Sequence, residues 1–215
     1  MTIKERYRNI IGWFETNVPD PKTELHYESP YQLLVAVILS AQCTDARVNI
    51  VTPPLFKAFP TPADLANASI EEIYEFIKSV TYPNNKAKSL KGAAQMLIDK
   101  FDGQVPANLD DLTALPGVGR KTANVMLSVV FGEAAMAVDT HVFRVSERLG
   151  LTSGSKTPNE TEKTLTSNIP TEKLSKAHHW LILHGRYICK ARKPLCMECG
   201  LTAFCRFFSS TRRIQ

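Results

Sequence analysis

The sequence predicts an all-α fold. Helix N-cap signatures recur along the chain, and the apolar residues between them return at helical spacing. No segment shows a convincing strand-like alternation of apolar and polar residues, and the intervening loops are short. A chain of 215 residues with 44% apolar content can bury one large core or two smaller ones.

The first half of the chain marks its helices at their N-termini. Ser29-Pro30 opens an apolar stretch, so serine is the expected N-cap and proline the first helical residue. Ser69 and Glu72 predict a capping box ahead of another helix. Further helices are expected from Thr44, from Thr61 and over Lys86–Phe101. Because Pro53-Pro54 interrupts the helix from Thr44, we expect a break or kink there.

The second half carries the glycine and proline signals that end helices. Asp110 is expected to cap a short helix that stops at Pro116. Four more helices are expected over Arg120–Phe131, Thr140–Leu149, Asn159–Ser167 and Glu172–Ile188, the first closed by Gly132 and the second by Gly150.

Positive charge is concentrated near the C-terminus. The net charge is +5, but from Arg186 onward seven Lys/Arg face the single acid Glu198. This pattern indicates a polyanionic partner such as nucleic acid, although a solubilising tail has the same composition. The longest apolar run, Leu33–Ala41, is too short to cross a bilayer, and no signal peptide is evident. We therefore expect a cytoplasmic protein without a membrane partner.

Four of the five cysteines lie within 17 residues in the pattern C-x6-C-x2-C-x5-C. They are Cys189, Cys196, Cys199 and Cys205. In a reducing cytosol such crowding favours a metal site over disulfides, and both zinc and an iron-sulfur cluster are chemically possible. Cys43 stands alone and is expected to be a small buried residue.

A Gly-x-Gly turn separates two of the expected helices. The segment Gly117, Val118, Gly119 and Arg120 allows a tight hairpin whose backbone N–H groups lie beside a helix N-terminus, where a phosphate is favoured. Such a contact would be blind to base sequence. A plain helix-to-helix turn remains the alternative on these residues alone.

Lys121 and Asp139 are the candidate reactive residues. A cation is disfavoured near the positive end of a helix, which favours Lys121 as the neutral amine that can attack carbon, although a solvated surface lysine is the simpler interpretation. Asp139 is the expected N-cap of the helix from Thr140. A capping carboxylate can also stabilise positive charge or handle protons.

Longer strings of residues resemble one enzyme family. The string from Leu115 to Ala123 is similar to the helix-hairpin-helix of base-excision DNA glycosylases, and Val138–Arg144 resembles the segment carrying their catalytic aspartate. With Leu39–Gln42, His179–Arg186 and the terminal cysteines, the resemblance is to the endonuclease III family and covers nearly the whole chain.

This resemblance implies a fold, a cofactor and a reaction. It implies a six-helix lobe over residues 23–133, a discontinuous lobe from residues 1–22 and 134–215, and a [4Fe-4S] cluster in the loop 189–205 held by the four cysteines. It further implies that Lys121 attacks C1′ of a nucleotide swung out of the duplex, that a Schiff base forms, and that β-elimination cuts the strand. Asp139 would act on the same sugar.

The expected partner is double-stranded DNA with damaged bases or abasic sites, bound by a monomeric enzyme close to the nucleoid. By position, Gln42 matches the family's gap-filling glutamine, and Tyr82 falls at a second wedge position. The chain departs from the family at Thr81, where glycine is expected, and at Pro83. The basic residues Lys190, Arg192 and Lys193 lie between the first two cysteines and are candidates for phosphate contacts.

Three functions remain to be separated. The first is a bifunctional glycosylase and abasic-site lyase for oxidised pyrimidines. The second is a monofunctional adenine glycosylase, against which Lys121 argues. The third is a non-catalytic DNA-binding protein, against which the presence of both Lys121 and Asp139 argues.

Overall fold

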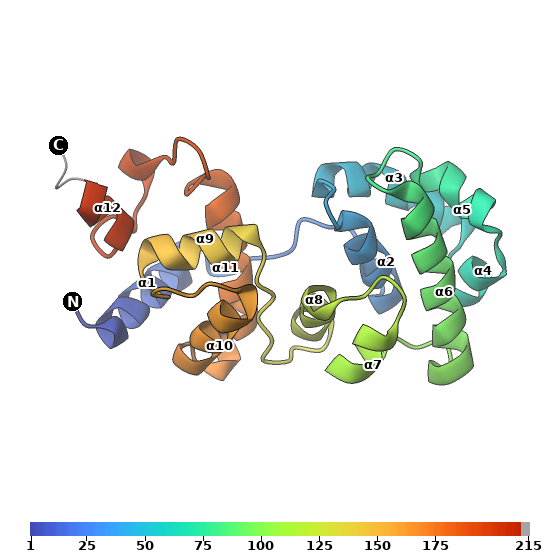
Figure 1. The fold of residues 1–215 in the computed structure, drawn as a ribbon, viewed down its shortest axis with the longest axis horizontal. Coiled ribbons are helices and arrows are strands. Elements are labelled where there is room, and N and C mark those ends of the chain that lie inside the picture. Colours follow the sequence, from blue (N-terminus) through green and yellow to red (C-terminus); the bar gives the residue numbers. More distant parts are fainter. Residues whose placement is uncertain (212–215) are drawn as a thin grey trace. The chain divides into compact units, whose positions relative to one another are not determined.

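The computed structural model describes residues 1–211, so Arg212 and Arg213 of the basic tail lie outside the described range. The regular elements within it are all helices, which confirms the predicted all-α class (Figure 1). The chain divides into two compact units: a central unit, Glu24–Phe131, and a terminal unit, Met1–Thr23 with Gly132–Gln215. None of the helices within residues 1–211 combines the length and apolar character that crossing a bilayer requires.

Seven helices occupy the central unit, one more than the six expected. They are α2 (Pro30–Ser40), α3 (Asp45–Ala58), α4 (Pro62–Asn67), α5 (Ile70–Ile77), α6 (Pro83–Phe101), α7 (Leu109–Ala114) and α8 (Arg120–Val130). Helix α2 is buried along nearly its whole length and packs on α3, α6 and α8. Because α2 is apolar all round, it forms the middle of this unit's core.

Local capping signals fix several helix starts as predicted. The Ser29 side chain accepts a hydrogen bond from the Gln32 N–H, and Ser69 with Glu72 forms a complete capping box. Two expected starts were wrong. Asn108, rather than Asp110, caps α7, because its side chain reaches the Asp111 N–H. Helix α6 begins at Pro83 instead of Lys86, since the fixed φ of proline suits the first helical position.

Of the break or kink expected at Pro53-Pro54, the break was wrong, because α3 continues through both prolines. The prolines remove two amide donors from the helix. Buried residues on both sides, Val48, Val51 and Leu55, anchor the helix to the core. Packing of this face holds the helix together where its hydrogen bonding is incomplete.

The terminal unit is built around Trp180. Its α-helices are α1 (Ile3–Asn17), α9 (Thr140–Leu149), α10 (Pro158–Asn168), α11 (Leu174–Tyr187) and α12 (Arg206–Thr211). No residue pattern predicted α1 or α12. The Trp180 ring stacks on Phe14 with ring centroids 5.5 Å apart, and its indole N–H donates to the Val18 carbonyl at 2.7 Å. These contacts pack the N-terminal helix against α11.

Candidate active site

Lys121 follows a tight hairpin between α7 and α8. Gly117 has φ 81°, and a Cβ there would lie 2.7 Å from the Ser89 Cβ on α6, so this position requires glycine. Val118 is buried, and its N–H donates to the Leu115 carbonyl at 3.0 Å, which closes the turn. The Val118 amide is therefore used inside the hairpin.

Helix α8 begins without a capping side chain. Its N-cap, Gly119, is exposed, and a Cβ there would meet open space. Gly119 has no side chain with which to cap the first turn, and backbone N–H groups at such a helix start can bind an anion from outside the chain. The opposite face buries Ala123 and Met126, so Lys121 stands exposed on a firmly anchored helix.

Asp139 is the N-cap of α9. Its Oδ1 accepts hydrogen bonds from the backbone N–H groups of His141 and Val142, both at 2.8 Å. The side chain is half-buried, and Val138 before it and Val142 after it are buried. The carboxylate is thus held in one orientation, with both capping bonds made through a single oxygen. Lys121 belongs to the central unit and Asp139 to the terminal unit.

The two candidate wedge residues occupy exposed turns of the central unit. Gln42 lies just beyond the end of α2, and Tyr82 is the N-cap of α6. Both have left-handed backbone, with φ 54° and 56°. Tyr82 is 60% exposed, so its ring is available to stack on a base.

The four clustered cysteines line one mostly apolar cavity. Burial raises the pKa of the Cys196, Cys199 and Cys205 thiols, and neighbouring cysteines raise it further. Across residues 1–211, no three His, Cys, Asp or Glu side chains meet as the ligands of a single metal ion would. Four thiols gathered around one cavity fit a group larger than a single ion, which would bind through the thiolates.

His184 lies next to this cavity and does not supply charge. Its Nε2 is 3.7 Å from the Cys199 Sγ, and its ring meets the Phe14 ring edge-on. Burial lowers the pKa of His184 to about 4, so the imidazole is neutral at physiological pH.

Two arginines of α9 fasten the cysteine loop to the helix that Asp139 caps. Arg148 donates to the carbonyls of Lys190 at 2.7 Å and Ala191 at 3.0 Å. Arg144, one turn earlier, donates to the carbonyls of Cys189 at 3.2 Å and Gly185 at 2.9 Å. No sequence pattern indicates these contacts, because both arginines look like ordinary surface residues of a helix.

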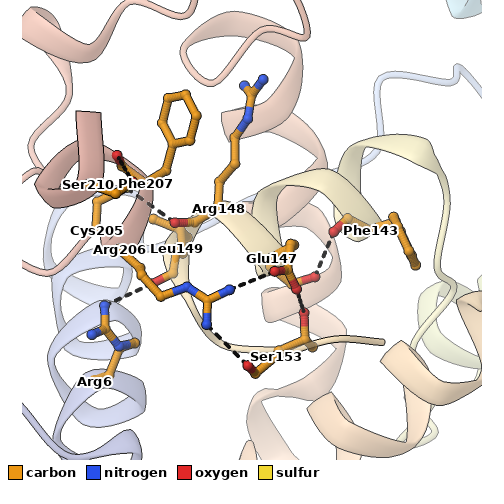
Figure 2. A network of polar contacts seen from close by, with 12 residues as sticks. Arg6, Phe143, Glu147, Arg148, Leu149, Ser153, Cys205, Arg206, Phe207 and Ser210 are labelled. Atoms are coloured by element: carbon orange, nitrogen blue, oxygen red, sulfur yellow. Dashed lines mark hydrogen bonds and ion pairs between the residues drawn. The ribbon is translucent and has the colours of Figure 1, made fainter. Parts of the chain in front are cut away.

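The far end of the cysteine loop is fastened to α9 as well. Arg206, next to Cys205, donates to Glu147 at 2.6 Å and to the Ser153 hydroxyl at 3.1 Å (Figure 2). Arg6 of α1 donates to the carbonyls of Leu149 and Phe204. The loop is therefore held at both ends, while its three basic side chains, Lys190, Arg192 and Lys193, are exposed.

Two family models match the chain. Residues 35–171 match the HhH-GPD superfamily base excision DNA repair protein, a range that includes Lys121 and Asp139. Residues 189–205 match the iron-sulfur binding domain of endonuclease III, a range that begins and ends on cysteine ligand candidates.

Individual relatives extend the similarity over almost the full length. The endonuclease III of Rickettsia conorii is 50% identical over 199 residues, 93% of this chain and 94% of that protein. The endonuclease III of Bacillus subtilis is 50% identical over 188 residues, 87% and 86% of the two proteins. A solved structure of a trapped endonuclease III–DNA covalent intermediate superimposes with a TM-score of 0.92 at 46% identity, covering 100% of both chains.

Proposed function

Because the chain belongs to the endonuclease III family of HhH-GPD base excision DNA repair proteins, we propose that Lys121 and Asp139 carry out its chemistry. The protein is a bifunctional DNA glycosylase and AP lyase that removes oxidised pyrimidines and binds damaged duplex DNA. It carries the family's iron-sulfur domain. We further propose that it acts as a monomer in the cytoplasm, at the nucleoid.

The assignment of Lys121 as the nucleophile rests on its position directly after the hairpin. It is an exposed amine at the second position of an uncapped helix, within the matched family segment. Phosphates bound by the Gly119 and Lys121 amides would bring the DNA backbone to this amine. A relative that forms a covalent intermediate with DNA needs a nucleophile, and a neutral lysine amine can serve as one.

The reaction begins with attack of the Lys121 Nζ on C1′ of the extruded nucleotide. The bond from C1′ to Nζ forms, the glycosidic bond breaks, and the departing base takes up a proton. Opening of the sugar ring then gives an imine between C1′ and Nζ. The imine acidifies the 2′ proton, whose removal expels the 3′ phosphate and cuts the strand. Hydrolysis of the imine returns the free lysine.

Asp139 is proposed to act on the same sugar. Its carboxylate can stabilise the positive charge that develops on the sugar as the base leaves, or accept and return protons. Because the two capping bonds fix its orientation, little conformational entropy is lost when DNA binds.

Cys189, Cys196, Cys199 and Cys205 are the residues that would hold the [4Fe-4S] cluster. With four protein ligands, the bound cluster supplies a structural cross-link for the loop that presents Lys190, Arg192 and Lys193. Those side chains, with Gln42, Tyr82 and the hairpin residues Gly117, Val118, Gly119 and Arg120, form the proposed DNA-binding set. In this set Val118 serves by shaping the turn, since its amide is already bonded.

A panel of three duplexes tests the function. One carries thymine glycol, one an abasic site and one an adenine mispair, and products are resolved with and without alkali. The proposal predicts strand cleavage at thymine glycol and at the abasic site without alkali. Alkali-dependent cleavage of the adenine mispair alone would indicate a monofunctional adenine glycosylase, and binding without cleavage would indicate a non-catalytic protein.

A further inference from the structure

Two exposed turns of the central unit hold non-glycine residues in left-handed backbone. Gln42 and Tyr82 have φ 54° and 56°, a region that side chains with a Cβ disfavour. Tyr82 caps α6 with its backbone only, because no side-chain capping bond is made there. Two turns that keep such a conformation need contacts that hold them.

One of these contacts joins the turns directly. The Thr81 hydroxyl donates to the Gln42 carbonyl at 2.7 Å, across 39 positions of sequence. The bond links the backbone of the Gln42 turn to the residue immediately before Tyr82. Glycine, the residue that the family resemblance leads us to expect at position 81, has no hydroxyl with which to make this bond.

A second contact holds the same turns from beneath. The buried Lys86 Nζ donates to the Leu39 carbonyl at 2.8 Å and to the Ala41 carbonyl at 2.7 Å. A cation at the C-terminus of α2 is well placed to satisfy its last carbonyls. The Lys86 backbone N–H donates to the Tyr82 carbonyl at 3.1 Å. Lys86 therefore makes hydrogen bonds to both turns.

We propose that Thr81 is a positioning residue that sets the Gln42 turn against the Tyr82 turn, so that the two side chains enter the duplex as a preformed pair. The inference rests on the proposed function, in which Gln42 and Tyr82 occupy the stack opened by the lesion. Unstacking is costly, and the groups that fill the gap offset this cost best when they need not be ordered first. Thr81 touches no DNA in this scheme and acts through the Gln42 backbone.

Thr81→Val and Thr81→Ser separate positioning from folding. Valine keeps the shape and loses the hydroxyl, whereas serine keeps the hydroxyl. Single-turnover excision of thymine glycol is measured in a fully paired duplex and in a duplex whose lesion lies in a pre-opened bubble. Thr81→Val is expected to be about threefold to tenfold slower on the paired duplex, the range for losing one hydrogen bond, and to match wild type on the bubble. Thr81→Ser should restore the paired rate.

A double-mutant cycle tests the route of the effect. In a Gln42→Ala background, Thr81→Val should cause no further loss on the paired duplex, because the side chain it positions is gone. Three results would overturn the inference: a paired rate equal to wild type, equal slowing on both substrates, or full additivity with Gln42→Ala. If wild type cuts thymine glycol duplex and Thr81→Val matches it, only the inference fails; if wild type does not cut, the proposed function fails with it.

Discussion

Substitution can separate the role of the Asp139 carboxylate as the cap of α9 from its proposed role on the sugar. Asparagine retains a side-chain oxygen in the position of Oδ1 and can accept the His141 and Val142 N–H groups, but it carries no charge. Alanine removes both the cap and the charge. Asp139→Asn and Asp139→Ala therefore differ chiefly in the cap.

The expected magnitudes follow from the two 2.8 Å capping bonds. Losing an N-cap costs about 1 kcal/mol, and losing a negative charge at a helix N-terminus costs about 0.3–1 kcal/mol. At about 2–4 °C per kcal/mol for a protein of this size, Asp139→Asn should lower the melting temperature by about 1–4 °C. Asp139→Ala should lower it by a further 2–4 °C or so. Excision should fall about 100-fold or more in both, as for the loss of an acid-base or electrostatic group.

The assay pairs thermal melting with single-turnover excision of thymine glycol on each variant. The two variants should be similarly inactive but unequally stable. A rate for Asp139→Asn close to wild type would refute the catalytic role. Equal melting temperatures for the two variants would refute the cap as a contributor to stability.

The hairpin and the basic loop give two further predictions. Gly117→Ala should destabilise the protein by about 1–3 kcal/mol in denaturant titrations, because φ is positive at this position and a Cβ would collide with Ser89. Gly119→Ala should cost less than about 1 kcal/mol, because a Cβ there meets open space. Equal losses of stability in the two variants would contradict this reasoning. A triple variant combines Lys190→Gln, Arg192→Gln and Lys193→Asn, with asparagine chosen because residue 193 has left-handed backbone. It should bind duplex DNA more weakly and reduce the slope of log K against log salt by about 2–3. An unchanged slope would reject the phosphate contacts.

Local sequence signals predicted much of the fold. Ser29, Ser69 and Asp139 cap helices as expected because a capping bond joins residues two or three positions apart, so the sequence contains both partners. The all-α class follows from such signals repeated along the chain. Pro53-Pro54 misled because the buried face of α3, a tertiary contact, outweighs a local helix breaker.

The parts of the site that could not be predicted depend on long-range contacts. Thr81 reaches the Gln42 carbonyl, and Arg148 reaches the carbonyl of Lys190, across 39 and 42 positions of sequence. Neither the residue type nor the local position of these two side chains indicates which distant carbonyl each one bonds. The proposed reactive residues could be singled out only because a hairpin, a lysine and a capping aspartate occur together in one family pattern.

Borohydride trapping tests the central claim most directly, because reduction of an imine leaves the enzyme joined to DNA through the amine that formed it. Wild type, incubated with a thymine glycol or abasic duplex and borohydride, should give a covalent complex. Lys121→Gln should give none while still binding the duplex, and its melting temperature should match wild type because residue 121 is exposed. Undiminished trapping by Lys121→Gln would contradict the assignment of Lys121 as the nucleophile.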